Sequence, residues 1–489
     1  MTDTYDLIVL GAGPVGENVA DRAVRGGLTA LIVERELVGG ECSYWACMPS
    51  KALLRSGQAL RAARAVPGSA EAVSGELDVA AVLARRDAFA SDWDDAGQAD
   101  WLRGAGVDLV RGHGRVDGER RVVVTDADGR ERVLHARHAV AICTGSDAAI
   151  PPVPGLRAAE PWTSREATSA REVPESLAVI GGGVVAVELA TAFAALGSRV
   201  AVLARSGLLG GFESFAGEAV ADGLRALGVD VRLGSDIRGV ERDASGVTVR
   251  TADGDVRASE VLVATGRIPR SAGIGLESIG IGPGGDGGTD RGAPASEFAP
   301  GRPIPTDDTL RVPGTDWLYA VGDVAGRAPL THQGKYEARA AGDIIAARAS
   351  GGPVDDAAWG RHAASADRAA VPQVVFSSPE VAAVGLTERA ARESGRTVRV
   401  ADAAFSSVAG ASLHADGYRG RGRIVIDAER DVLLGATLVG EDVAELIHAA
   451  TVAVVGEVPL ARLWHAVPAY PTMSEVWLRL LEADGRDSA

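Results

Sequence analysis

The stretch YDLIVLGAGPVGENVADRAVRGGLTALIVER, residues 5–35, reads as a strand, a glycine-rich turn, a helix and a second strand. Its turn holds Gly11, Gly13 and Gly16 in the spacing G-x-G-x-x-G. The first glycine permits a tight turn, the second lets the backbone approach a pyrophosphate, and the third lets the helix pack closely on the strand. Glu34 ends the second strand at the spacing expected of an acid that binds a ribose hydroxyl. The stretch therefore predicts a dinucleotide-binding unit.

The same pattern recurs in residues 176–207, SLAVIGGGVVAVELATAFAALGSRVAVLARSG. Gly181, Gly183 and the small residue Ala186 occupy the three positions. A strand precedes this turn, and a helix and a second strand follow it. We therefore expect the chain to bind a second dinucleotide.

The end of this second strand indicates which nicotinamide cofactor binds. Ala204 stands where an NAD site usually offers a carboxylate, and Arg205 is next to it. An acid would bind the 2′-hydroxyl and repel a 2′-phosphate, whereas an arginine attracts that phosphate. The pair favours NADPH, and NADH is the alternative if Arg205 is only a solvated loop charge.

A cysteine pair lies between the two units, in GGECSYWACMPSK, residues 39–51. Cys42 and Cys47 are two of the three cysteines in the chain, too few for a disulfide framework. A zinc site wants four ligands, and the third cysteine, Cys143, is remote in sequence. Cys143 lies in the apolar run AVAIC and is expected to be a buried small hydrophobe. A redox pair and an inert structural pair remain as the two readings.

Two dinucleotide units with C-x4-C between them resemble the FAD-dependent pyridine nucleotide-disulfide oxidoreductases, a family that includes lipoamide dehydrogenase, glutathione reductase, mercuric reductase and soluble transhydrogenase. The resemblance covers nearly the whole chain. The segment 39–51 is similar to the family's GG-x-C-x4-C-x-P-S-K. Further segments resemble its two ATG turns (142–146 and 263–270), its second FAD motif (318–324) and the opening of its dimerisation domain (371–388).

The resemblance implies which residues hold the cofactors FAD and NADPH. The residues implied for FAD are Gly11, Gly13, Gly16, Glu34, Gly40, Lys51, Gly114, Thr144, Gly145, Gly322 and Asp323. The residues implied for NAD(P) are Gly181, Gly183, Ala186, Arg205 and Gly266. Among these, Asp323 would meet the ribityl chain of the flavin.

The resemblance also implies catalytic roles. In the family the cysteines lie beside the flavin near a helix N-terminus, where the helix dipole lowers thiol pKa values. Cys47 would be the flavin-side, charge-transfer thiol and Cys42 the interchange thiol that meets the substrate. Lys51 matches the lysine near the flavin N5, and Glu188 in AVEL matches its ion-pair partner. Surface charges are the alternative for these two residues.

The end of the chain departs from the family pattern. Disulfide reductases of the family carry H-P-T-x-x-E, in which the His, oriented by the Glu, reaches into the other subunit's active site as acid-base catalyst. Here LWHAVPAYPTMSEVW places Tyr470 in the His position and retains Glu475. A phenol with a pKa of about 10 is a weaker acid than an imidazole with a pKa of about 6.5. His465 is a candidate substitute, although a surface or packing role suits it better.

Length and charge set further limits. A chain of 489 residues is expected to form two or three domains. The formal net charge of -16 argues against a nucleic-acid partner. Because no apolar run reaches the length of a membrane span and the N-terminus lacks a signal-peptide pattern, we expect no membrane association and a cytoplasmic location.

The resemblance implies an α/β fold with two Rossmann-like domains and a C-terminal α+β dimerisation domain. Residues 1–150 and 260–335 would form the FAD-binding domain, 151–259 the NAD(P)H-binding domain, and 336–489 the interface domain of a homodimer with active sites shared across the interface. The Gly/Pro/Asp-rich segment 282–302 is expected to be a mobile insertion.

We therefore expect an FAD flavoenzyme that takes hydride from NADPH and passes electrons, through the Cys42–Cys47 pair, to a small acceptor such as a quinone or related electrophile. One alternative is a small-molecule disulfide reductase or an enzyme like dihydrolipoamide dehydrogenase. A second is a soluble pyridine nucleotide transhydrogenase. A non-catalytic FAD-binding partner subunit is the alternative from another class. Mercury reduction is disfavoured because the tail RLLEADGRDSA holds no cysteine pair.

Overall fold

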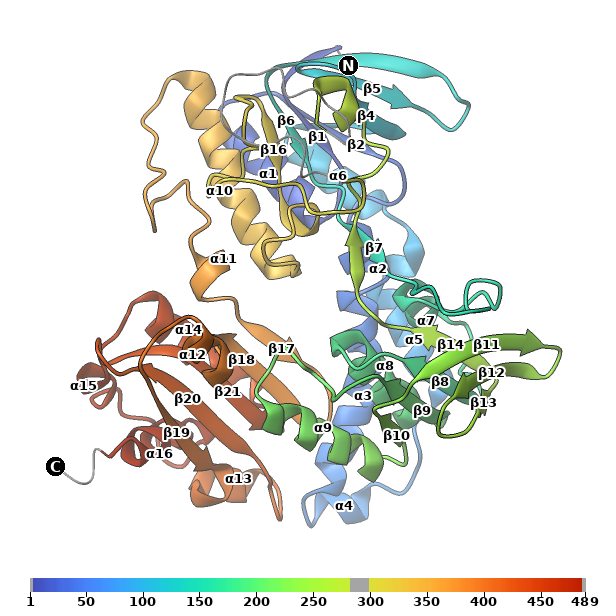
Figure 1. The fold of residues 1–489 in the computed structure, drawn as a ribbon, viewed down its shortest axis with the longest axis vertical. Coiled ribbons are helices and arrows are strands. Elements are labelled where there is room, and N and C mark those ends of the chain that lie inside the picture. Colours follow the sequence, from blue (N-terminus) through green and yellow to red (C-terminus); the bar gives the residue numbers. More distant parts are fainter. Residues whose placement is uncertain (1–2, 282–298, 486–489) are drawn as a thin grey trace. The chain divides into compact units, whose positions relative to one another are not determined.

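The structure, a computed structural model, describes residues 3–281 and 299–485 (Figure 1). The chain divides into two compact units, each assembled from three segments. Unit 1 comprises Met1–Met48, Asp87–Asp147 and Arg267–Arg368, and unit 2 comprises Pro49–Arg86, Ala148–Gly266 and Ala369–Ala489. Of the insertion predicted at 282–302, residues 282–298 lie outside the described part of the chain.

Unit 1 is built on a seven-stranded sheet in the order β3-β2-β1-β6-β5-β4, with β16 also paired to β6. The strands β1, β2, β3, β6 and β16 are parallel, and β4 and β5 pair antiparallel at one edge. The sequences of β1 and β2 are nearly continuous apolar runs because parallel strands are covered on both faces. The strands are β1 (Thr4–Leu10), β2 (Ala30–Glu34), β3 (Val107–Arg111), β4 (His113–Val116), β5 (Arg121–Thr125), β6 (Glu131–Ile142) and β16 (Leu318–Ala320).

Helices α1 (Pro14–Arg25) and α10 (Thr331–Ser350) pack together and share a core with one face of this sheet. Small residues permit the close approach, since a Cβ on Gly342 would lie 2.5 Å from the Cβ of Arg22. This packing places α10 in unit 1. Further short elements of unit 1 include α2 (Gly40–Tyr44), α6 (Ala96–Gly104) and the turn η4 (Gly322–Val324).

Unit 2 contains the second dinucleotide-binding sheet, parallel and four-stranded in the order β10-β9-β8-β14, and a three-stranded antiparallel sheet, β11-β12-β13. The strands are β8 (Ser176–Ile180), β9 (Arg199–Ala204), β10 (Asp230–Leu233), β11 (Ile237–Asp243), β12 (Gly246–Thr251), β13 (Val256–Ala258) and β14 (Glu260–Val263). The helices around them are α7 (Ser164–Ser169), α8 (Val184–Ala195) and α9 (Ser214–Ala226).

Helix α3 (Cys47–Arg64) begins at the end of a unit 1 segment and continues in unit 2, followed by α4 (Ser69–Ala72) and α5 (Val79–Phe89). Leu53 and Leu54 of α3 and Val82 of α5 share a buried cluster with Ala192 and Leu196 of unit 2. This apolar contact explains why residues 49–86 group with unit 2.

The C-terminal part of unit 2 is a five-stranded antiparallel sheet in the order β17-β18-β21-β20-β19. Its strands are β17 (Gln373–Val375), β18 (Glu380–Gly385), β19 (Val398–Ala404), β20 (Arg421–Asp427) and β21 (Val432–Gly440). Its helices are α12 (Glu388–Glu393), α13 (Ala409–His414), α14 (Ile447–Val455), α15 (Leu460–Leu463) and α16 (Val476–Ala483). The predicted α/β class, with two dinucleotide-binding sheets and a C-terminal α+β part, is confirmed. Over residues 3–281 and 299–485, the structure contains no helix long and apolar enough to cross a bilayer.

Candidate active site

The first dinucleotide cradle lies where β1 ends and α1 begins, in unit 1. Gly11 has a φ of +104°, and a Cβ there would lie 2.5 Å from the carbonyl oxygen of Cys143. A Cβ on Gly13 would meet no described atom within 4 Å, so the backbone faces open space. Gly13 is the N-cap of α1 and makes no side-chain capping hydrogen bond, which leaves the helix N-terminus available to an anion. The cradle fits the pyrophosphate of FAD.

Glu34 and Gly40 hold the loop that follows this cradle. Glu34 is buried at the end of β2, and its Oε2 accepts a hydrogen bond of 2.6 Å from the backbone N–H of Ala12. Its Oε1 accepts one of 2.7 Å from the N–H of Glu36. A Cβ on Gly40 would lie 2.9 Å from the Cα of Gly13. The acid predicted for the ribose therefore also fixes the glycine turn, and Gly40 lets α2 begin against that turn.

Asp323 lies in a polar chain at the turn η4, which follows β16. Ser146 Oγ donates a hydrogen bond of 2.5 Å to Asp323 Oδ2, and Arg267 Nε donates one of 2.6 Å to Ser146 Oγ. Gly322 provides the positive φ, +81°, that the turn requires. Three segments remote in sequence therefore orient the carboxylate predicted to meet the flavin's ribityl chain.

The other glycines and the threonine predicted for FAD also lie in unit 1. Thr144 Oγ1 donates a hydrogen bond of 2.7 Å to the carbonyl of Arg270, and the Arg270 N–H donates one of 2.9 Å to the carbonyl of Gly145. A Cβ on Gly114, in β4, would lie 2.8 Å from a methyl group of Leu10. The residues around 144 and 270 are thus tied together beside the cradle.

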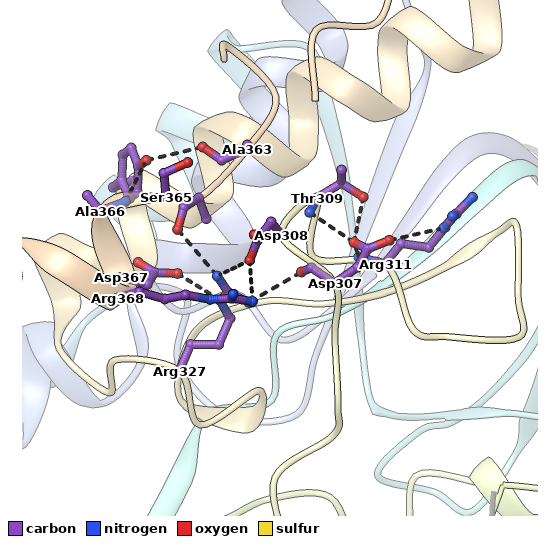
Figure 2. Close-up of polar contacts among 12 residues, drawn as sticks. Asp307, Asp308, Thr309, Arg311, Arg327, Ala363, Ser365, Ala366, Asp367 and Arg368 are labelled. Atoms are coloured by element: carbon purple, nitrogen blue, oxygen red, sulfur yellow. Dashed lines mark hydrogen bonds and ion pairs between the residues drawn. The ribbon is translucent and has the colours of Figure 1, made fainter. Parts of the chain in front are cut away.

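Arg327, in the segment between the Asp323 turn and α10, forms ion pairs that hold this segment in place (Figure 2). Its Nε lies 2.8 Å from Asp367 Oδ2, and its Nη2 lies 3.0 Å from Asp308 Oδ1. Gln333 of α10 donates a further hydrogen bond of 2.7 Å to Asp367 Oδ1. These contacts fix the start of α10, the helix that approaches the cysteine pair.

Cys42 and Cys47 lie side by side as thiols in unit 1, at α2 and the start of α3. Cys47 Sγ lies 3.3 Å from Oγ1 of Thr331, the first residue of α10. The hydrogen bond with Cys47, and then burial, raise the pKa of the Cys42 thiol. Cys47 begins an 18-residue helix, whose dipole favours a thiolate there. The arrangement lets the two sulfurs hydrogen-bond to each other and disfavours deprotonation of Cys42.

Cys143, the third cysteine, is 6% exposed and packs in the core beside β1, as predicted. In the part of the chain that the structure describes, no three His, Cys, Asp or Glu side chains gather in a way that would hold a metal ion.

Lys51 and Glu188 form an ion pair within unit 2, with 2.7 Å between Lys51 Nζ and Glu188 Oε2. Glu188 lies in α8 and is 4% exposed. Its Oε1 accepts a hydrogen bond of 3.0 Å from the backbone N–H of Phe376, and the ammonium of Lys51 lies 5.1 Å from the centre of the Phe376 ring. A buried acid with two partners holds the ammonium in one place.

The second cradle repeats the first in unit 2. Gly181 follows β8 with a φ of +140°, and a Cβ there would collide with the carbonyl oxygen of Ala264. A Cβ on Gly183, the N-cap of α8, would meet no described atom within 4 Å. Ala186 is fully buried in the first turn of α8, and Gly266 has a φ of +128°. The cradle fits a second pyrophosphate.

Arg205 is the first residue after β9 and its side chain is exposed. Ala204 is buried at the end of the strand, and a Cβ on Gly182 would lie 3.1 Å from its Cβ. The strand end therefore presents a cation, and no carboxylate, next to the glycine turn.

The C-terminal segment presents Tyr470 to solvent, with the side chain 78% exposed. Glu475 is buried, and its Oε2 accepts a hydrogen bond of 3.3 Å from the backbone N–H of Gly410 in α13. His465, just after α15, is exposed. Glu475 therefore anchors the segment to α13.

The sequence analysis missed Thr331 and two buried acids, Glu17 in α1 and Glu337 in α10. Burial raises the pKa of Glu17 to about 7 and that of Glu337 to about 8. Glu337 Oε2 accepts a hydrogen bond of 2.7 Å from the N–H of Gly322, so it supports the turn of Asp323. No local sequence signal marks Glu337, which lies between Lys335 and Arg339, and none marks Thr331.

Two dinucleotide cradles and a dithiol define a pyridine nucleotide-linked oxidoreductase. Residues 5–338 match the family described as pyridine nucleotide-disulphide oxidoreductase, and residues 371–480 match the dimerisation domain of that family. The chain belongs to this family, whose members are FAD-dependent enzymes. It is thus an enzyme that binds FAD, uses a pyridine nucleotide and forms a homodimer.

Two curated relatives and two solved structures show how broad the likeness is. Dihydrolipoyl dehydrogenase of Chlorobaculum tepidum is 33% identical over 96% of this chain and 95% of its own length. Mercuric reductase of Shigella flexneri is 32% identical over 96% of this chain and 79% of its own length. LpdA of Mycobacterium tuberculosis is 25% identical with a TM-score of 0.78, covering 100% of both chains. The HOCl-induced flavoprotein disulfide reductase RclA of Escherichia coli shares the fold, with a TM-score of 0.80 at 23% identity over 98% of this chain and 99% of its own.

Proposed function

We propose that this flavoenzyme takes hydride from NAD(P)H, with NADPH favoured, and delivers two electrons through FAD and a redox-active Cys42–Cys47 disulfide to a small acceptor such as a quinone or related electrophile. The observation that carries the proposal is the pairing of the two thiols beside Thr331, in the unit that forms the first cradle. When bound, FAD supplies acceptance of the hydride and return of its two electrons.

Residues of the chain determine where the proton and the negative charge lie after the disulfide is reduced. Two-electron reduction of the disulfide breaks the S–S bond, and one proton suffices if one sulfur stays a thiolate. The raised pKa of Cys42 favours Cys42 as the sulfur that holds this proton. The negative charge then falls on Cys47, at the N-terminus of α3. This division supports the assignment of Cys47 as the flavin-side thiol and Cys42 as the interchange thiol.

Lys51 and Glu188 are proposed to act on the hydride step. The ion pair fixes an ammonium that would lie near the flavin N5, where a positive charge favours the reduced, electron-rich ring. Arg205, exposed after β9, is proposed to bind the 2′-phosphate of NADPH.

The acceptor is inferred from Tyr470 and Glu475. In a homodimer with shared active sites, the C-terminal segment would deliver a phenol in place of an imidazole. A phenol can hydrogen-bond a quinone oxygen, but at neutral pH it cannot act as an imidazolium beside the dithiol. Since Glu475 binds the backbone of Gly410, the segment keeps its shape without a histidine.

The second candidate substrate is a small-molecule disulfide, which would accept electrons, or a small-molecule dithiol, which would donate them. The vicinal thiols favour it, as does the similarity to dihydrolipoyl dehydrogenase along nearly the full length of both chains. A histidine at position 470 would have supported this candidate more strongly.

The test is anaerobic NADPH and NADH oxidation by the holoenzyme against a panel of benzoquinones, oxidised lipoamide, glutathione disulfide and thio-NAD. We expect quinone turnover to exceed disulfide turnover by about 10²-fold or more, because general acid-base catalysis contributes that much where an acid is needed. Faster turnover with a disulfide, or with thio-NAD, would replace the quinone proposal with one of the two alternatives. Failure of NADPH to bleach the flavin would indicate a non-catalytic FAD-binding protein.

A further inference from the structure

Lysine is nearly absent from this chain. Of its 50 lysine and arginine residues, only Lys51 and Lys335 are lysines. Arginine therefore occupies almost every position of the chain at which a positive charge alone is required. The two side chains differ, because the ammonium is a compact charge that can release a proton and the guanidinium is wide, planar and always charged. A lysine in this composition marks a position where the compact ammonium is preferred, and Lys51 is one such position.

Lys335 lies on α10 one helical turn after Thr331, so both side chains are on the same face of the helix. Thr331 contacts Cys47, which brings this face to the cysteine pair. The side chain of Lys335 is half-buried and interacts electrostatically with the Cys42 thiol. Both residues belong to unit 1.

Glu17 of α1 also interacts electrostatically with Lys335. Glu17 of α1 is 8% exposed, and its Oε1 has no hydrogen-bond partner among the described residues. The charge of Lys335 lowers the pKa of Glu17, while burial and Glu34 raise it, to about 7. Tyr44 of α2 also interacts with Glu17. Glu337, on α10 itself, is engaged with Gly322. Lys335 is thus a half-buried cation that interacts with both Glu17 and the thiol of Cys42.

We infer that Lys335 supplies the positive charge that stabilises the Cys42 thiolate, in an enzyme whose C-terminal segment delivers Tyr470 in place of an imidazole. When Cys42 releases its proton to solvent to begin exchange, its sulfur becomes negative and the ammonium compensates for that charge without forming a bond. The role rests on the proposed dithiol function, since it matters to turnover only if Cys42 reacts.

The test measures the Cys42 thiol directly. The holoenzyme is reduced with dithiothreitol, freed of reductant and alkylated with iodoacetamide under argon from about pH 6 to pH 10, since the alkylation rate follows the thiolate fraction. Modification of the Cys42 peptide is quantified by mass spectrometry. The variants are Lys335→Gln, Lys335→Arg and the matched control Arg339→Gln, which removes an exposed charge one turn further along α10. Bound FAD absorbance confirms that each variant is folded.

We expect Lys335→Gln to slow alkylation of Cys42 near neutral pH by about three- to tenfold and to move its pH midpoint upward. Lys335→Arg should lie closer to the wild type, and Arg339→Gln should coincide with it. Coincidence of Lys335→Gln with the wild type would overturn the inference, as would an equal shift in Arg339→Gln or in Lys335→Arg. If Lys335→Gln shifts the pH midpoint of Cys42 alkylation but the wild-type enzyme reduces no acceptor, the proposed function is refuted and the charge role of Lys335 stands.

Discussion

Lys51 Nζ lies 2.7 Å from Glu188 Oε2, and the two partners are unequally buried: the lysine side chain is 37% exposed and the glutamate side chain 5%. Removing the lysine leaves a buried carboxylate whose remaining hydrogen bond, among the described residues, comes from the Phe376 N–H. Removing the glutamate's charge leaves an ammonium that water can reach.

The variant Lys51→Met is therefore expected to lower the free energy of unfolding more than Glu188→Gln, by about 2–3 kcal/mol against about 1 kcal/mol. Urea unfolding of both variants, followed by circular dichroism, measures the difference. An equal or reversed loss would show that the pair is held by packing and not by charge.

Arg205→Ala is expected to raise the KM for NADPH about tenfold more than the KM for NADH, the loss expected for one charge-assisted hydrogen bond of about 1.5 kcal/mol. Arg199→Ala, at the exposed start of the same strand, is the control and should affect both cofactors equally. Equal changes with both cofactors in Arg205→Ala would remove the basis for NADPH preference.

Local sequence was sufficient for the parts of the site that lie within one βαβ unit. Gly11, Gly13 and Gly16 all lie between the end of β1 and the first turn of α1, so their spacing in the sequence predicts the cradle. Arg205 directly follows β9, so the strand pattern predicts its position. The contact of Cys47 with Thr331 spans 284 positions, and that of Ser146 with Asp323 spans 177. Such contacts depend on how the sheet and α10 pack together, so no short motif predicts them.

The division of the chain into compact units cannot be read from the motifs, for a related reason. Motif positions do not reveal that α10 packs on α1 or that Leu53 and Leu54 of α3 share a core with α8. The small residues that allow the first contact, such as Gly342, are unremarkable in a chain with 62 glycines.

Glu337 predicts a pH dependence of stability. Its pKa is raised to about 8, chiefly by burial, whereas an exposed glutamate titrates near pH 4.3. The folded state therefore holds a proton that the unfolded state has lost, and this contribution is fully present below about pH 4 and lost as the pH rises through about 8. In Glu337→Gln, the fall in urea midpoint between about pH 6 and pH 9 should be smaller than in the wild type. Glu277→Gln, an exposed control in the same unit, should fall as the wild type does. If the urea midpoint of Glu337→Gln falls with pH as steeply as that of the wild type, Glu337 is not buried in its protonated form.

Tyr470→His is expected to increase disulfide turnover, by up to about 10²-fold, because an imidazole restores a proton donor at neutral pH. Reduction of the flavin by NADPH, measured by stopped flow, should stay nearly unchanged. Tyr470→Phe is the control, and it should lower quinone turnover without creating disulfide activity. Fast wild-type reduction of a small disulfide that the His substitution leaves unimproved would make Tyr470 a competent acid and favour a disulfide reductase.

The central claim is that Cys42 and Cys47 cycle between disulfide and dithiol, and anaerobic titration of the oxidised holoenzyme with NADPH tests it most directly. The first two electrons should produce a long-wavelength absorbance band, which a Cys47 thiolate forms against oxidised flavin, together with two additional thiols that react with Ellman's reagent. Cys47→Ser should lose the band and the gain of two thiols on reduction, because Cys42 then has no disulfide partner, while Cys143→Ala should keep both signals, since Cys143 is buried in the core. Bleaching of the flavin alone, with no band and no gain of thiols, would show that the pair is structural.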